Sequence, residues 1–345
     1  ILTVVYMHAI LNLGIPALLR YSIGDGVSIF FVLSGFLIGK ILLNTINKAA
    51  FSLRDLTGFW IRRWMRTLPA YFFVLTFLII YQVTTGSKSF SDYYHYYFFA
   101  QSFFHNGAAL YPESWSLCVE EWFYLIVPLV FLISARDSKN ALLFCITSII
   151  VVCSAIGVIK ATPLSGHDEW DVHVRQATIS RFDSIMYGVL GAYCSYHGLW
   201  KHRKTLFIIG LSCYLAITLY YDLFGFTVFL KYTWLPIQSI AVLLTLPFLE
   251  NMKTGRGIIY SAATFISVIS YSMYLLCFTP FQIIHAKLSS FLHVNSTGFT
   301  AVLYLAITFG GAYLLNRLIE KPFMNLRDRH ARKKQQGTTK KSVPT

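Results

Sequence analysis

The chain has 345 residues, of which 56% are hydrophobic and 13% are charged. A soluble globular protein carries roughly 25% charged residues, so this composition excludes an ordinary water-soluble enzyme, and it also excludes a disordered chain. The formal net charge of +14 would suit a nucleic-acid-binding protein, but basic residues also collect in the cytoplasmic loops of membrane proteins. We therefore expect an all-α polytopic membrane protein with no nucleic-acid partner.

Ten hydrophobic segments predict a transmembrane helical bundle of about ten spans. They cover residues 1–19, 26–43, 68–83, 115–134, 141–159, 180–196, 205–222, 233–249, 264–286 and 299–318. An aromatic segment at 93–104 is too short to span a bilayer, so we expect an interfacial or re-entrant helix there. This pattern predicts a transmembrane domain over residues 1–322, followed by a basic, disordered cytoplasmic tail over 323–345.

The distribution of positive charge predicts the orientation of the bundle. If both termini lie in the cytoplasm, most of the 29 Lys and Arg residues fall in inner connections or in the tail. This is the arrangement that the positive-inside rule favours. The many basic residues of the tail are expected to lie against anionic membrane lipid.

Two ionisable residues near the first two spans are candidate site residues, because such groups are rare in membranes. His8 lies in the aliphatic stretch ILTVVYMHAILNLG and can take a proton from a hydroxyl. A neutral histidine that is hydrogen-bonded between helices is the alternative. Asp25 precedes the second span, where we favour a helix-capping role over a catalytic one. Ser34 and the glycines beside it indicate close helix packing.

Three arginines gather at the inner entry of the third span, in the stretch FWIRRWMRTLPAY. On a helix, Arg62 and Arg66 share a face, and so do Arg63 and Arg66. Guanidinium groups bind phosphate through two parallel hydrogen bonds, so this cluster is a candidate phosphate site. An ordinary positive-inside anchor explains the same cluster equally simply.

The stretch ESWSLCVEEWFYL places two acidic residues in an apolar helix. Trp115 and Glu120 fall roughly on one face of that helix, and a buried carboxylate at Glu120 needs a partner such as His8 or an arginine. Glu121 is expected to remain at the outer interface in contact with water.

Further along the chain, polar residues within spans predict contacts between helices. Arg181 and Asp183 suggest an interhelical ion pair, and Tyr271 suggests a hydrogen bond between helices. No combination of side chains in the sequence suggests a metal site, and the six cysteines are typical of reduced, buried hydrophobic residues.

Five ordered strings together carry a resemblance to a known family. They are GDGVSIFFVLSGFL, FWIRRWMRTLPAY, WSLCVEEWFYL, RFDSIMYG and SYSMYL, and the similarity extends from ILTVVYMH to IEKPF near the tail. The chain resembles the integral-membrane acyltransferase family 3, whose members include bacterial O-acetyltransferases of lipopolysaccharide O-antigen, Nod factors and other glycans. The resemblance implies a bacterial inner-membrane enzyme.

The resemblance also implies roles for individual residues. His8 corresponds to the histidine of the first family motif, Arg63 and Arg66 correspond to its Arg-x-x-Arg motif, and Glu120 corresponds to the carboxylate of its third motif. One departure is Cys277, which stands where many members carry histidine.

From the resemblance we expect acetyl-CoA as the acyl donor, a carbohydrate hydroxyl as the acceptor, and no metal. The arginines, Arg62 included, would hold the phosphates of CoA, and His8 with Glu120 would act on the hydroxyl, either as a base or as a covalent acetyl relay. Residues expected to support the site or bind substrate are Asp25, Ser34, Trp115, Arg181, Asp183 and Tyr271. The alternative is a secondary transporter of a glycan or small metabolite, because buried ionisable groups occur in both classes. The sequence does not predict an oligomeric state.

Overall fold

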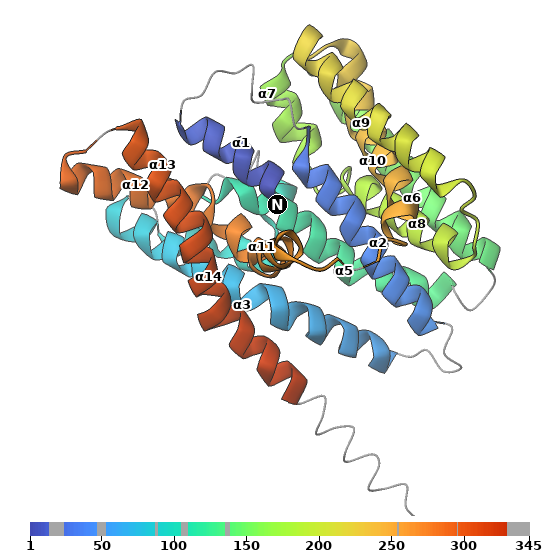
Figure 1. The fold of residues 1–345 in the computed structure, drawn as a ribbon, viewed down its shortest axis with the longest axis horizontal. Helices are drawn as coiled ribbons and strands as arrows, with labels where there is room; N and C mark the ends of the chain where they lie inside the picture. The colour runs from blue at the N-terminus through green and yellow to red at the C-terminus, as the bar shows by residue number, and fades with distance from the viewer. Residues whose placement is uncertain are drawn as a thin grey trace, which may run out of the picture.

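A computed structural model gives the fold (Figure 1) and describes residues 1–13, 24–46, 53–86, 89–104, 110–134, 139–253, 255–294 and 296–329. All regular secondary structure in these ranges is helical, which confirms the all-α prediction. The elements are α1 (Leu2–Leu13), α2 (Gly26–Ile46), α3 (Leu53–Thr85), η2 (Phe90–Asp92), η3 (Tyr94–Phe98), α4 (Gln101–Phe104), η4 (Pro112–Ser114), α5 (Trp115–Ser134), α6 (Lys139–Ala161), α7 (His167–Trp170), η5 (Asp171–Arg175), α8 (Phe182–Tyr196), α9 (Arg203–Phe224), α10 (Val228–Leu249), α11 (Ile258–Leu276), α12 (Thr279–Leu292), α13 (Thr297–Leu305), η6 (Ala306–Gly311), α14 (Ala312–Leu315) and η7 (Asn316–Glu320).

Within the described residues, eight helices are long and apolar enough to cross a membrane. They are α2, α3, α5, α6, α9, α10, α11 and the continuous helix that runs from α13 to Arg329. This last helix continues beyond the boundary expected at residue 322, and residues 330–345 of the expected tail lie outside the described residues. The transmembrane class predicted from the sequence is therefore confirmed.

Two of the ten expected spans are not among these eight helices. The segment expected at 1–19 is described only to residue 13, where it forms the 12-residue helix α1. The segment expected at 180–196 forms α8, which has 15 residues and is shorter than the roughly 20 residues of a typical span. Because α8 packs among α2, α6 and α10, most of its side chains are buried by protein.

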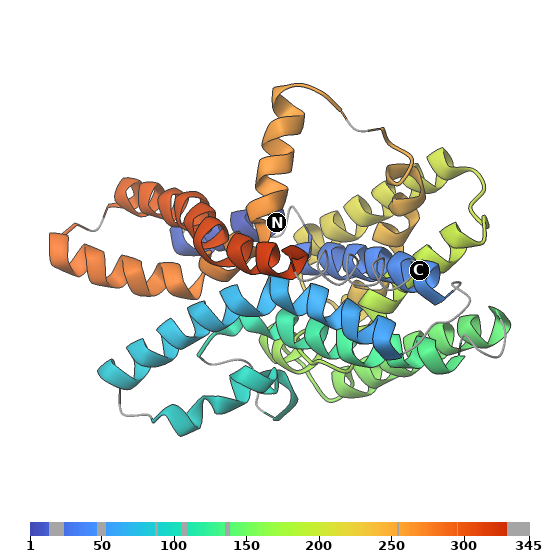
Figure 2. The ribbon, with the colours of Figure 1, turned by 90° about the horizontal axis from the view of Figure 1, so that it is seen from below.

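The segment expected to span at 264–286 is broken in the structure. α11 ends at Leu276, and α12 begins at Thr279 with Pro280 in its first turn. Proline fits the first turn of a helix, where its missing N–H needs no partner, but it interrupts the interior of a helix. As a result α11 stands across the direction of most other helices, end-on in Figure 1 and upright in Figure 2.

The aromatic segment near 93–104 folds back along α3. The Tyr71 hydroxyl on α3 donates to the Tyr96 carbonyl oxygen at 3.0 Å. The Trp122 indole N–H on α5 donates to the Phe99 carbonyl oxygen, also at 3.0 Å. These contacts fill the space between α3 and α5, so that α5 begins part-way along α3.

α2 and α8 cross closely, and the crossing depends on two glycines. A Cβ atom added at Gly35 on α2 would overlap the Ile185 carbonyl oxygen on α8. A Cβ atom added at Gly188 on α8 would overlap the Val32 carbonyl oxygen on α2 in the same way. Small residues that allow two backbones to approach closely are a common device for packing helices in membranes.

We expect Gly35→Ala to lower the stability of the folded protein by about 1–3 kcal/mol, because the added methyl group overpacks the crossing. Thermal unfolding of the detergent-solubilised protein would measure this effect. Gly157→Ala on α6 is the matched control, since the nearest side-chain atom to its new Cβ would lie 3.7 Å away. Equal unfolding temperatures for the two variants would contradict this account of the crossing.

Candidate functional site

A cavity of ≈ 360 Å³ lies at one end of the bundle, between α1 on one side and the short helices α7 and η5 on the other. Its floor is formed by the starts of α2 and α5 and by the junction of α11 and α12. The polar side chains that line it include His8, Asp25, Glu113 and Arg175. Much of the remaining lining is aromatic, with Trp115, Trp170, Tyr221, Phe226, Trp234, Tyr274 and Phe278.

The imidazole of His8 lines this cavity, as a catalytic base would have to. Its ring lies against Phe278, with the ring centres 4.5 Å apart and the ring planes tilted by 34°. Its Nδ1 atom is buried and has no hydrogen-bond partner among the described residues. The Asn12 amide donates to the His8 carbonyl oxygen at 2.8 Å, which fixes the backbone of α1 beside the ring. The structure therefore does not show the interhelical hydrogen bond that would give His8 a purely structural role.

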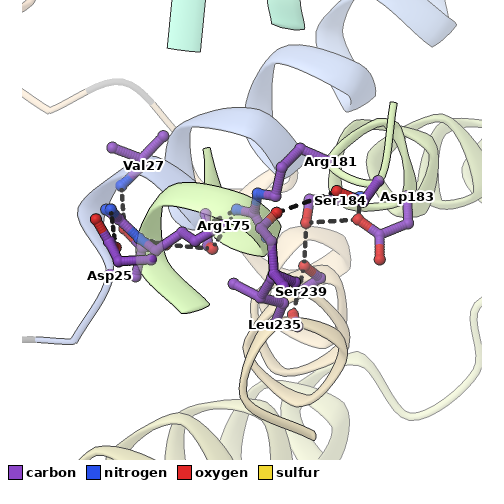
Figure 3. Close-up of polar contacts among 12 residues, drawn as sticks. Asp25, Val27, Arg175, Arg181, Asp183, Ser184, Leu235 and Ser239 are labelled. Carbon is purple, nitrogen blue, oxygen red and sulfur yellow. Dashed lines mark hydrogen bonds and ion pairs between the residues drawn. The ribbon is translucent and has the colours of Figure 1, made fainter. Parts of the chain in front are cut away.

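Asp25 caps α2, as the sequence predicts, and also carries the central ion pair of the cavity wall (Figure 3). Its carboxylate accepts from the Val27 N–H at 3.1 Å and from the Ser28 hydroxyl at 2.7 Å. Burial by itself would raise the pKa of Asp25, but the guanidinium groups of Arg175 and Arg181 outweigh it and hold this pKa at about 2. Asp25 is therefore a charged structural group at neutral pH.

Arg175, which the sequence patterns did not single out, connects Asp25, Asp171 and Trp115 in the wall of the cavity. Its Nη2 lies 3.1 Å from Asp25 Oδ1, and its Nη1 lies 2.9 Å from Asp171 Oδ1. Its guanidinium also sits 5.1 Å from the centre of the Trp115 ring, within the range of a cation–π contact. The spacing of four residues between Asp171 and Arg175 was the available signal, since such pairs meet on a helix.

Arg181 and Asp183 do not form the expected ion pair with each other (Figure 3). Arg181 donates to the Ser28 hydroxyl at 2.8 Å and lies 3.8 Å from Asp25. Asp183 instead accepts from the hydroxyls of Ser154 and Ser184, both at 3.1 Å. The expectation is wrong because residues two positions apart on a helix face different directions. Both side chains still join helices, as supporting residues would.

A second polar cluster lies deeper in the bundle, between α2, α3 and α5. The Arg63 guanidinium donates to the Tyr124 hydroxyl at 2.6 Å and to Glu120 Oε2 at 3.2 Å. The same tyrosine hydroxyl lies 2.5 Å from the Ser34 hydroxyl. The structure thus brings together three residues that the sequence selected, Ser34, Arg63 and Glu120.

Glu120 and His8 belong to different sites. Glu120 does not line the cavity, and the described residues show no contact between it and His8. The cavity that His8 lines contains a different glutamate, Glu113, which lies seven positions before Glu120 and about 10 Å away along the chain axis. Sequence analysis missed Glu113, and its place two residues before Trp115 in the motif was the only signal.

The three arginines of α3 divide into one inward and two outward side chains. Arg63 is 19% exposed and pairs with Glu120, as described above. Arg62 and Arg66 are exposed, and within the described residues no carboxylate lies within ion-pair distance of either. Phosphate binding by the cluster would therefore fall mainly to Arg62 and Arg66.

Glu121 and Tyr271 form further hydrogen bonds to α3 near this cluster. Glu121 is buried, where contact with water was expected, and it accepts from the Trp64 indole at 3.0 Å and the Thr67 hydroxyl at 3.3 Å. That expectation is wrong because α5 begins part-way along α3, so the second turn of α5 already packs against α3 and is shielded from water. The Tyr271 hydroxyl donates to the Thr67 carbonyl oxygen at 3.0 Å, which confirms a hydrogen bond between helices.

No group of three His, Cys, Asp or Glu side chains suited to a metal ion occurs in the part of the chain that the structure describes.

Comparisons with known proteins agree on one family. A family model described as an acyltransferase domain matches residues 1–317. The peptidoglycan O-acetyltransferase OatA of Listeria monocytogenes is 37% identical over 134 residues, which are 33% of this chain and 21% of that protein. The O-acetyltransferase OatA of Staphylococcus aureus is 29% identical over 184 residues, which are 49% of this chain and 29% of that protein. No solved structure matches the chain.

Each of these matches therefore spans less than a third of the relative's own length. The family model, in contrast, matches nearly the whole of this chain, including the segments that carry His8, Arg63, Arg66 and Glu120. The protein belongs to the acyltransferase family 3 of integral-membrane proteins.

Proposed function

We propose that the protein is a membrane O-acetyltransferase that moves an acetyl group from acetyl-CoA to a hydroxyl of a cell-surface or lipid-linked carbohydrate. The observation that carries this proposal is the His8 imidazole, which faces an aromatic-lined cavity at one end of the bundle. Family membership and the O-acetyltransferase names of the two relatives support the reaction class.

The cavity suits a sugar acceptor. Ligand sites combine mostly apolar walls with a few polar groups that fix orientation. Here the indole rings of Trp115, Trp170 and Trp234 provide flat apolar surfaces, and Glu113 and the Asp25–Arg175 pair provide polar edges. Under the orientation expected from charge, this end of the bundle faces the outside of the cell, where a peptidoglycan or other surface glycan would enter.

The opposite half of α3 suits the donor. Arg62 and Arg66 are exposed, and no carboxylate of the described residues lies within ion-pair distance of either. Guanidinium groups in such positions bind phosphates well. The charged phosphates of CoA cannot enter the hydrocarbon core, so they would remain at these arginines on the cytoplasmic side. The long arm that carries the thioester would then extend past the Arg63–Glu120 contact toward the cavity.

The chemistry that follows needs one base. The His8 imidazole takes the proton from the acceptor hydroxyl as its oxygen attacks the thioester carbonyl carbon. The carbon–sulfur bond breaks, CoA leaves as a thiolate, and the imidazolium returns the proton to that sulfur. Arg63, Glu120 and Tyr124 would hold α3 and α5 together beside the path of the arm.

We expect His8→Ala to abolish acetyl transfer while the protein still inserts and folds, because removing the base leaves only binding. Membrane vesicles supplied with radiolabelled acetyl-CoA, followed by counting of the carbohydrate fraction, would measure the reaction. General-base catalysis contributes about 10²–10⁴-fold to a rate, so a smaller loss would exclude His8 as the base. A transporter would give no labelled carbohydrate even in the wild type.

We expect Arg66→Ala to raise the KM for acetyl-CoA with little change in kcat, because a lost phosphate contact weakens binding equally in the ground and transition states. The loss of one charge-assisted hydrogen bond, worth about 1.5–3 kcal/mol, corresponds to a change of about 10- to 100-fold. Arg256→Ala, in the exposed connection before α11, is the matched control for loss of a surface cation. An Arg66→Ala variant with the control's KM would remove the phosphate role.

A further inference from the structure

The start of α12 lies directly against the His8 imidazole. Phe278, the residue that precedes α12, lies against the His8 ring with the ring centres 4.5 Å apart and the ring planes tilted by 34°. Four residues after Phe278, the Gln282 amide donates to the Asn12 side-chain oxygen at 3.3 Å, and Asn12 itself donates to the His8 carbonyl oxygen. The start of α12 therefore contacts the His8 ring directly through Phe278 and is linked to the His8 backbone through Asn12.

Glu113 holds this first turn in place. Its Oε1 accepts from the Thr279 backbone N–H at 2.8 Å, and its Oε2 accepts from the Thr279 hydroxyl at 2.6 Å. The N–H groups of the first turn of a helix have no partner within the helix, so a side-chain oxygen that accepts from one of them holds the helix start in place. Glu113 is 4% exposed, and its two carboxylate oxygens are both used in this contact.

Residues 111–113 also hold the end of α11, on the other side of the break between α11 and α12. The Tyr274 hydroxyl donates to the Glu113 carbonyl oxygen at 2.5 Å, and the Tyr111 hydroxyl donates to the Leu275 carbonyl oxygen at 2.7 Å. The break between α11 and α12 is thus fixed from both sides by residues 111–113. Without the carboxylate, residues 111–113 would hold only the α11 side of the break.

We propose that Glu113 is a positioning residue for the reaction: by holding Thr279 at the start of α12, it keeps the Phe278 ring against the His8 imidazole. The proposal rests on the proposed function, in which His8 acts as the base. A base must be held within hydrogen-bond reach of the hydroxyl it deprotonates, and a displacement of about 1 Å is enough to slow a reaction by about 10²-fold.

Three substitutions separate positioning from a direct chemical role. Glu113→Ala removes both contacts to Thr279, and we expect kcat to fall by about 10²-fold with an unchanged KM for acetyl-CoA, since the arginines of α3 are untouched. Glu113→Gln can accept from the Thr279 N–H and donate to its hydroxyl, so its kcat should stay within a few-fold of wild type. Thr279→Val keeps the N–H but loses the hydroxyl, so its kcat should fall between the two.

The matched control is Ser296→Ala. Ser296 caps α13 by accepting from the Phe299 N–H at 3.2 Å, so its loss removes a helix cap without touching the cavity. Its kcat should equal that of wild type. If Glu113→Gln is as inactive as Glu113→Ala, the negative charge itself is required and the positioning role is overturned. A wild-type kcat in Glu113→Ala would overturn it as well.

A chemical measurement tests the position of His8 without relying on catalysis. Diethyl pyrocarbonate modifies imidazole nitrogens, and mass spectrometry of the full-length protein's peptides would follow His8 and the exposed His293 separately. In Glu113→Ala and Thr279→Val we expect faster modification of His8, because Phe278 no longer covers its ring, and unchanged modification of His293. Unchanged modification of His8 in both variants would refute the positioning role. The modification rates test the positioning role whether or not the wild type transfers an acetyl group. A wild type that transfers no acetyl group would refute only the proposed function.

Discussion

A buried carboxylate in an apolar bundle must be paired, and the pairing of Asp25 organises the end of the protein that contains the cavity. Removing one partner from a buried ion pair costs about 3–5 kcal/mol, because the other charge is left uncompensated. Asp25 caps α2, Arg175 ends η5, and Arg181 precedes α8, so one carboxylate connects the start of α2 to a region about 150 residues later in the chain. Arg175 then covers Trp115, which closes the floor of the cavity.

The polar groups of the bundle fall into two zones with different chemistry. The cavity holds His8 and Glu113 among aromatic rings, and in the proposed function the acceptor binds there. The cluster of Arg63, Glu120 and Tyr124 lies about one to two helical turns deeper. This separation fits a reaction in which the donor and the acceptor approach from opposite sides of a membrane.

Family resemblance alone would have placed Glu120 next to His8. Both residues belong to motifs of the same family, but they lie on helices that are not in contact at that depth. In the structure Glu120 neutralises Arg63, while Glu113 acts on His8 only through Thr279 and Phe278. A family motif therefore selects candidate site residues, but it does not predict which side chains they contact.

The amino-acid sequence by itself determined the membrane class, most of the spans and the capping position of Asp25, because these depend on hydrophobic length and on local backbone geometry. Even there, Pro280 broke one expected span and protein packing sheltered the short helix α8. Only the tertiary structure decided that Arg175 pairs with Asp25, 150 residues away in the chain, and that Glu113 shares the cavity with His8. Such pairings depend on the depth at which each helix starts relative to its neighbours, and no local spacing in the sequence encodes that depth.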